Sequence, residues 1–280
     1  MTTKSTLSTF IARDGDHVAI QDWPLGQGET LRGVVLLVHG LGEHVGRYDH
    51  VARQLNDWGF AVRGYDQYGH GESGGLRGGL TTDHRLLDDL ADVVARTRAR
   101  MQANTPRILL GHSMGGLVAG RFVALAIRPV DALVMSSPAL DPGLNAVQKI
   151  LLAVLPRIAP NLRVGNGLDA SLISHDPATV AAYRADKLVH DRVSGRLARF
   201  IAEGGPATVA LASTWKVPTL LLYAGADKLV NPAGSHAFAA AAPKSVVSSR
   251  CFESLFHEIF NELKPTPVFA ELKKWLDARF

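Results

Sequence analysis

A serine between closely spaced glycines is the first feature of this sequence that could do chemistry. Residues Gly111 to Gly116 read Gly-His-Ser-Met-Gly-Gly, so Ser113 has a glycine two positions before it and two positions after it. An apolar run ends at Leu110, and a helical pattern begins at Leu117. This strand–turn–helix setting is typical of a nucleophile elbow, whose tight turn holds the hydroxyl above a sheet. We therefore predict that Ser113 is a catalytic nucleophile.

A nucleophilic serine needs a general base and a carboxylate that orients the base. After a nucleophile elbow, these partners follow along the chain in the order acid, then histidine. Asp227 comes just after the apolar run 219–223, and His257 comes just after the run 246–252. Because open α/β sheets build their sites at the carboxyl ends of strands, we predict that Asp227 orients His257 and that His257 acts on Ser113.

The sequence holds rival candidates for both partners. The rivals are His175, His190 and His236 for the base, and Glu253 and Glu258 for the acid. His112 is next to Ser113, but we expect its side chain to point elsewhere because adjacent side chains diverge on such a turn.

The tetrahedral intermediate of acyl transfer carries an oxyanion, which needs preorganised N–H donors. The amide of Met114, directly after the nucleophile, is predicted to supply one donor. The second is predicted to come from the His-Gly-Leu-Gly loop that follows the apolar run 34–38, and Leu41 is the best candidate there. Gly40 and Gly42 on either side let the backbone approach closely.

Short apolar runs alternate with helical patterns along the chain. The strands and helices that these patterns predict must position the candidate catalytic residues. The runs that we expect to be strands are 34–38, 60–65, 108–110, 132–135, 219–223 and 246–252. Continuous apolar runs fit strands covered on both faces, as in a parallel sheet. The first 23 residues indicate an antiparallel hairpin around the turn 14–16. The sequence therefore predicts an α/β fold with a mostly parallel central sheet and helices on both faces.

The connection from Pro138 to Val217 is far longer than a crossover needs. We predict a core of residues 1–137 and 214–280, and a helical cap insertion at 138–213 whose last third, 197–213, returns to the core as a helix. A polar turn is expected at 161–167.

Within the cap, apolar residues recur at helical spacing from Leu144 to Ile158. We interpret this stripe as the lining for an acyl chain with partial core packing, and Leu151 and Val154 are the candidate contacts. Basic residues flank the stripe, which is also compatible with transient contact with a membrane or micelle through the cap.

The composition narrows the class of protein. The chain of 280 residues is 46% hydrophobic and 20% charged, a balance typical of a globular protein. A chain of this length needs no disulfide or structural metal to stabilise it. A single cysteine, Cys251, excludes an intrachain disulfide and a cysteine-rich zinc site, and it favours a reducing compartment. The net charge of +4 comes from scattered residues, so no nucleic-acid partner is expected. Without an apolar window of roughly 18 residues, we expect a cytoplasmic protein, or one peripheral to a membrane, with no cofactor or metal.

Segments spread over the whole core resemble the monoacylglycerol lipase and lysophospholipase group of α/β-hydrolases. Residues 39–44 read His-Gly-Leu-Gly-Glu-His, and with Gly-Arg-Tyr at 46–48 they resemble the oxyanion segment of that group. Residues 66–73 resemble the D-x-x-G-H-G-x-S loop of α/β-hydrolases, and residues 111–116 match the group's elbow. Residues 225–227 and 256–258 match its acid and base segments.

The resemblance implies an α/β-hydrolase fold with a mobile cap and a serine hydrolase of lipophilic monoesters, such as monoacylglycerols or lysophospholipids, that works through an acyl-enzyme. It also implies that Glu43 and Arg47 support the oxyanion loop and the polar end of the pocket, and the alternative for this pair is an ordinary surface ion pair. Animal monoglyceride lipases carry a second histidine three places after the catalytic one, where this chain has Phe260.

Other functions with the same residues stay open. An amidase, a peptidase or a thioesterase would use the same triad, and a peptidase that holds a free amino terminus would need carboxylates in the cap. The cap carboxylates are Asp169, Asp176, Asp186 and Asp191. A non-catalytic ligand-binding module is the remaining alternative. The oligomeric state is not predicted.

Overall fold

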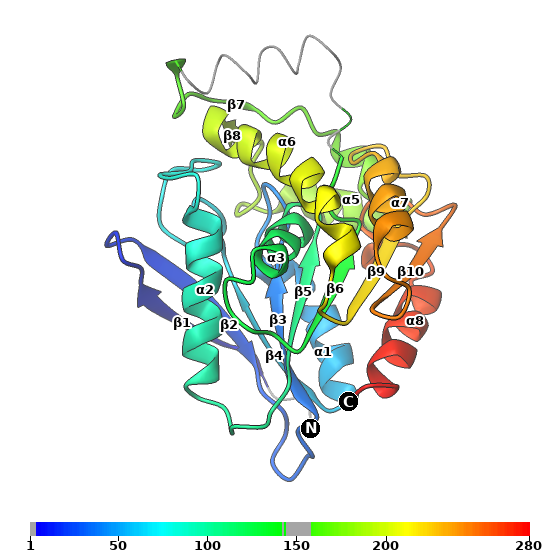
Figure 1. The fold of residues 1–280 in the computed structure, drawn as a ribbon. Helices are drawn as coiled ribbons and strands as arrows, with labels where there is room; N and C mark the ends of the chain where they lie inside the picture. The colour runs from blue at the N-terminus through cyan, green and yellow to red at the C-terminus, as the bar shows by residue number, and fades with distance from the viewer. Residues whose placement is uncertain (1–3, 142, 144–157) are drawn as a thin grey trace.

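The structure is a computed structural model that describes residues 4–141, 143 and 158–280 (Figure 1). The strands are β1 (Thr6–Ile11), β2 (His17–Trp23), β3 (Gly33–Val38), β4 (Phe60–Tyr65), β5 (Arg107–His112), β6 (Ala132–Ser136), β7 (Arg163–Gly165), β8 (Arg192–Ser194), β9 (Thr219–Ala224) and β10 (Val247–Phe252). The α-helices are α1 (Asp49–Asp57), α2 (Arg85–Arg98), α3 (Met114–Ala124), α5 (Pro177–Ala185), α6 (Gly195–Ala210), α7 (Pro232–Ala241) and α8 (Thr266–Asp277).

A central sheet organises the chain. In the part that the structure describes, eight strands pair in the order β1-β2-β4-β3-β5-β6-β9-β10. β2 pairs antiparallel with β1 and with β4, and the other neighbours pair parallel. This arrangement confirms the predicted mostly parallel sheet. The carboxyl ends of β3, β5, β9 and β10 lie at one edge, which is where the predicted site residues follow them (Figure 1).

Both faces of the central strands β3, β5, β6 and β9 are buried, which explains their continuous apolar runs. Along β3, Leu36 packs into a cluster with α2 and α3, while its neighbour Leu37 packs into a second cluster with α1 and α8. Successive side chains of a strand point to opposite faces, so a strand covered on both faces needs an apolar residue at every position.

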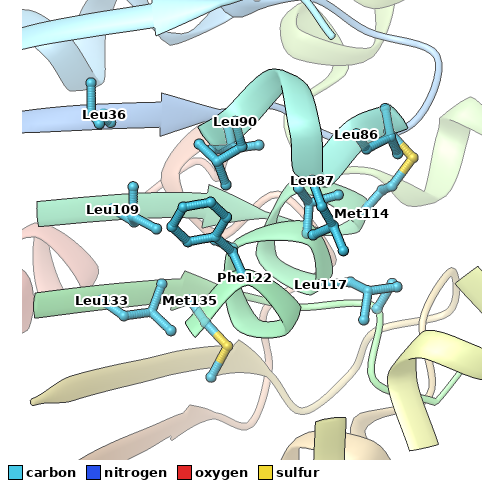
Figure 2. Close-up of a cluster of buried hydrophobic side chains, with 14 of the residues drawn as sticks. Leu36, Leu86, Leu87, Leu90, Leu109, Met114, Leu117, Phe122, Leu133 and Met135 are labelled. Atoms are coloured by element: carbon cyan, nitrogen blue, oxygen red, sulfur yellow. The ribbon is translucent and has the colours of Figure 1, made fainter. Parts of the chain in front are cut away.

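The hydrophobic cluster beneath α2 and α3 contains side chains from β3, β5 and β6 that pair in register. Leu36, Leu109 and Leu133 are register partners on β3, β5 and β6. Figure 2 shows these side chains beside Leu90 of α2 and Phe122 of α3. This packing fixes α3, and therefore the residue that precedes it, against the sheet.

We call the described residues 158–213 the insertion. They precede β9 in the chain and lie above the carboxyl ends of the strands (Figure 1). The helix predicted at 197–213 forms as α6 and packs against α3, where Gly204 faces Leu117. The polar turn expected at 161–167 contains β7, which pairs antiparallel with β8. That expectation was wrong because β7 takes its partner from a segment distant in sequence.

The predicted acyl-lining residues Leu151 and Val154 lie outside the described residues, as does most of the stripe. Its last member, Ile158, is 77% exposed. Among the described helices, none combines the length and the apolar character that crossing a membrane requires.

The buried position of Phe122 leads to a stability prediction. Phe122 is fully buried, whereas Leu125, directly after the end of the same helix, is 47% exposed. Phe122→Ala should lower the free energy of unfolding by about 3–5 kcal/mol, because it leaves a cavity between α3 and the sheet. Leu125→Ala should cost roughly 1 kcal/mol or less. Urea unfolding measures both, and equal losses would contradict this account of the core.

Candidate active site

The backbone at Ser113 is strained and firmly held. β5 ends at His112 and α3 begins at Met114, so Ser113 alone forms the turn, with φ of +54° and ψ of −120°. A Cβ at Gly115 would overlap the Val38 carbonyl oxygen, which explains the glycine there. The Ser113 N–H donates to the Ser136 carbonyl at 2.9 Å. Strain of this kind costs of order 1–3 kcal/mol and typically marks a functional residue.

Asp227 and His257 come together from the ends of two neighbouring strands. His257 Nδ1 lies 2.6 Å from Asp227 Oδ2. The other carboxylate oxygen, Oδ1, accepts the amides of Leu229 and Val230, each at 2.9 Å. With both of its oxygens engaged, Asp227 cannot rotate freely, so it fixes the orientation of the imidazole.

Ser113 and His257 line the same pocket, which has a volume of about 220 Å³. The predicted nucleophile and the predicted base are thus brought to one cavity, and Asp227 lies behind the base. This arrangement can support nucleophilic attack with proton transfer through the imidazole.

The charges around His257 suit a general base. Burial opposes a charge on the ring, but the carboxylate of Asp227 and its hydrogen bond outweigh burial, and Glu258 and Glu43 add to them, so the pKa of His257 is raised above its ordinary 6.5. Burial likewise opposes the charge on Asp227, but the charge and hydrogen bond of His257 outweigh it and lower the pKa of Asp227. Asp227 therefore stays ionised and stabilises the imidazolium that forms during proton transfer.

The two predicted oxyanion donors lie on either side of the nucleophile. The oxyanion loop, residues 39–42, passes so close that a Cβ at Gly40 would lie 3.2 Å from Ser113 Cβ. Among the described residues, the amides of Leu41 and Met114 donate to no protein acceptor. Met114 is also the first residue of α3, where helix N–H groups are unpaired and the dipole favours negative charge. Both amides are thus free to bind an oxyanion.

Glu43 and Arg47 are not a surface ion pair, because the Glu43 side chain is 4% exposed and that of Arg47 is 10% exposed. Glu43 Oε1 accepts the Gly40 amide at 2.5 Å and the Tyr48 hydroxyl at 2.6 Å. Arg47 pairs with Glu43 and, through two bonds of 2.8 Å, with Glu258. This buried network attaches the oxyanion loop to η1 (Val45–Tyr48).

Burial and pairing compete at Glu43. Burial, the largest single effect, opposes the charged carboxylate, but Arg47, His112, His39 and the Tyr48 hydroxyl together outweigh it. The pKa of Glu43 is thereby lowered to about 2. Glu43 is therefore a carboxylate at neutral pH, and it holds the Gly40 amide as a charged acceptor.

His112 does not point away from the site, so that expectation was wrong. Its ring lies 4.7 Å from the ring of His257 and lines the pocket, and its Nδ1 lies 3.1 Å from Ser136 Oγ. Burial, followed by the charge of His257, lowers the pKa of His112 to about 4, so the ring is neutral. The side chains of His112 and Ser113 can diverge and still border the same cavity, which the prediction did not consider.

The insertion supplies pocket residues, of which the sequence analysis named His190 only as a rival base and Asp186 only as a cap carboxylate, and did not name Tyr183. Tyr183 lines the pocket, and its ring lies beneath the Arg47 guanidinium at 4.7 Å. Asp186 and His190 also line it. Asp186 Oδ2 lies 2.8 Å from His44 Nε2. Tyr183 lies near the end of α5, and Asp186 and His190 lie between α5 and β8, so no periodic pattern in the sequence indicated that they reach the pocket.

The rival residues have other partners. His236 on α7 lies 3.0 Å from the Tyr223 hydroxyl, and Glu258 pairs with Arg47. Phe260 is buried against Phe269, with ring centroids 5.1 Å apart, rather than lining the pocket. In the described residues, no group of three or more histidine, cysteine or acidic side chains could hold a metal ion.

A sequence profile of the family described as "Serine aminopeptidase, S33" (Hydrolase_4) matches residues 29–264. The chain belongs to this family of α/β-hydrolases. It is 35% identical over 248 residues to the monoacylglycerol lipase of Mycolicibacterium smegmatis, a match that covers 88% of each chain.

Solved structures agree with this assignment. The monoacylglycerol lipase of Paleococcus ferrophilus is 31% identical, with a TM-score of 0.81 and 99% of each chain covered. A soluble variant of the monoglyceride lipase of Saccharomyces cerevisiae, at 24% identity, shares the fold with a TM-score of 0.90 over 99% of this chain and 96% of that one. The predicted α/β-hydrolase fold is confirmed.

The raised pKa of His257 predicts the pH dependence of ester hydrolysis. The base must be neutral to accept the Ser113 proton, so kcat/KM should rise with pH through an inflection above 6.5. Asp227→Asn removes the charge that raises this pKa, so burial should dominate and the inflection should move lower, with activity reduced by up to roughly 10⁴-fold. His236→Asn serves as the control and should leave the inflection unchanged. A wild-type inflection below 6.5 would contradict the assignment of His257.

Proposed function

We propose that the chain is a serine carboxylic-ester hydrolase that acts on lipophilic monoesters such as monoacylglycerols or lysophospholipids. The observation that carries this proposal is the 2.6 Å contact between His257 and Asp227, beside a pocket that the strained Ser113 also lines. The three residues would form a catalytic triad, with the amides of Leu41 and Met114 as the oxyanion hole.

In the proposed mechanism, Ser113 Oγ attacks the ester carbonyl carbon while its proton passes to His257 Nε2. The carbonyl oxygen becomes the oxyanion, which the amides of Leu41 and Met114 bind. The tetrahedral intermediate expels the alcohol, which takes the proton from His257, and an acyl-enzyme remains. A water molecule then gives its proton to His257 and attacks the acyl carbon. Collapse of this second intermediate releases the carboxylic acid and returns the proton to Ser113.

The proposed substrate class rests on the lining of the pocket and on the relatives. Apolar side chains border part of the pocket: Leu41, Leu168, Ile173, Val189 and Leu229. Several proteins to which the chain is similar carry the names monoacylglycerol lipase or phospholipase. We take residues 138–213 to be a cap over the core of 1–137 and 214–280.

The charged side chains of the pocket favour a neutral ester over a peptide with a free amino terminus. Glu43 and Glu258 are both engaged by Arg47. Asp186 is engaged by His44, and Asp191 lies 3.1 Å from an arginine neighbour. An incoming ammonium group would have to compete with these pairs, which supports ester hydrolysis over aminopeptidase chemistry.

Within this function, Glu43 and Arg47 would hold the oxyanion loop rather than touch the reacting atoms. The exposed apolar residues of the insertion would make transient contact with a membrane or micelle. Three of them, Leu162, Val164 and Leu168, lie close together in the sequence at 53%, 47% and 40% exposure, and Arg163 lies among them. Arginine beside exposed apolar groups is typical of an interfacial surface.

The assignment of the nucleophile is tested by Ser113→Ala. This variant should lose activity on p-nitrophenyl esters by roughly 10⁴-fold or more, because no other group can form the acyl-enzyme. It should also lose covalent labelling by a fluorophosphonate probe while keeping its thermal unfolding temperature. Ser249→Ala, an exposed serine on β10, is the control and should keep both. Retention of more than about a tenth of the activity by Ser113→Ala would show that the nucleophile is misassigned.

The substrate class is tested by a chain-length series. Each methylene buried in an apolar channel contributes about 0.8 kcal/mol, so kcat/KM on p-nitrophenyl esters should rise nearly fourfold per methylene until the channel is full. Monoacylglycerols and lysophospholipids should be hydrolysed, and aminoacyl amides should be poor substrates. A flat profile from two to sixteen carbons would refute the acyl-binding proposal, and preferred cleavage of aminoacyl amides would indicate a peptidase.

A further inference from the structure

His190 connects the insertion to the oxyanion loop. Its main-chain N–H donates to the Gly42 carbonyl oxygen at 2.8 Å. Gly42 has φ of +77°, and a Cβ at this position would overlap the His190 carbonyl oxygen. The two backbones therefore meet directly, one residue after Leu41, whose amide is a proposed oxyanion donor.

The imidazole of His190 fixes this meeting point. Nδ1 lies 3.2 Å from the main-chain nitrogen of Arg192, and Nε2 lies 3.1 Å from the Gly69 carbonyl oxygen. Because the Arg192 N–H can only donate, Nδ1 accepts, and the ring proton is on Nε2, which donates to Gly69. The side chain thus ties residue 190 to the body of the protein as well as to the first residue of β8.

Two more histidines continue from this ring to the other end of the oxyanion loop. The ring of His70 lies 4.7 Å from that of His190 and 5.3 Å from that of His39. His39 Nδ1 faces the Gly40 carbonyl oxygen at 2.8 Å, and its Nε2 accepts the Gln67 amide at 2.9 Å. The loop is therefore held at Gly40 from one side and at Gly42 from the other, with Leu41 between them.

The contacts between these three tilted rings favour uncharged imidazoles. Burial, followed by the charge of Arg77, lowers the pKa of His190 to about 4, although Asp191 opposes the shift. Burial also lowers the pKa of His70 and that of His39. At neutral pH the rings can therefore pack without repulsion, and the Arg192 amide keeps its acceptor.

From these contacts we propose that His190 is a positioning residue for ester hydrolysis. By holding Gly42, it keeps the Leu41 amide aimed at the oxyanion, so the catalytic site is complete only when the insertion is seated on the body. The proposal rests on the proposed function, and it adds a residue of the insertion to the machinery that stabilises the transition state.

Other contacts hold the insertion in place without His190. The Glu258 amide donates to the Ile173 carbonyl at 2.8 Å, and the Ser194 amide donates to the Gly78 carbonyl at 2.7 Å. Loss of the His190 ring should therefore leave the insertion attached, while the oxyanion loop loses one of its supports. This separation allows a structural role to be told apart from a positioning role.

The test is His190→Ala, with steady-state kinetics on a p-nitrophenyl ester. Interactions with the oxyanion form in the transition state, so kcat should fall about tenfold with KM changed less than about twofold. His190→Gln offers an amide donor to Gly69 and should recover most of kcat. Arg199→Ala is the matched control, because it removes a 2.5 Å contact of α6 with Asp83, remote from the loop, and it should keep wild-type kcat.

A kcat of His190→Ala within twofold of wild type would overturn the proposal, as would an equal loss in Arg199→Ala or a change confined to KM. If thermal unfolding shows that His190→Ala is not folded, His190→Phe carries the test with the same criterion, because it keeps a ring against His70 without the donor. Fluorophosphonate labelling of wild type and of Ser113→Ala is measured first. Failure of the proposed function then shows in the wild type, whereas failure of this proposal shows only in the ratio of variant to wild type.

Discussion

The left-handed backbone of Ser113 is the constraint on which the rest of the site depends. Ser113 alone joins a strand that ends one residue earlier to a helix that begins one residue later. The turn survives because the sheet and α3 are locked together by buried packing on both sides of it, including Phe122 and the leucines of β3, β5 and β6. The energy of the core thus keeps the Ser113 hydroxyl at the edge of the sheet.

Residues that follow strands could be predicted from the sequence, because a parallel sheet collects its strand ends at one edge. The runs before Ser113 and Asp227 are almost wholly apolar, and such runs arise when both faces of a strand are covered. The run before His257 is mixed, with exposed Ser249 and Arg250, because β10 is the last strand of the sheet. The contact between Asp227 and His257 follows from the pairing of β9 with β10, which the order of elements alone allowed. At Ser113, Asp227 and His257, the sequence pattern and the topology of the sheet therefore point to the same location.

Residues brought in by irregular segments could not be predicted in the same way. β7 has three residues, and it exists because β8 pairs with it from almost 30 positions away. His190, between α5 and β8, reaches the pocket through contacts with Gly42 and Gly69 that have no periodic signature. Tyr183 is on α5, but its contact with Arg47 joins segments distant in sequence, which the helical pattern does not reveal. For His112 the error was geometric, since two neighbouring side chains can diverge and still border one cavity.

Solvent hardly reaches the charged groups of Glu43, Arg47 and Glu258, and this determines how salt affects the geometry of the site. Dissolved ions screen charges on a protein surface over about 8–10 Å, but they screen buried pairs much less. With each of these side chains at most 10% exposed, the attachment of Gly40 to its carboxylate should be nearly independent of ionic strength. The geometry around Ser113 is thereby buffered against the salt content of the surroundings, while exposed pairs such as Arg53 with Asp49 weaken as salt is added.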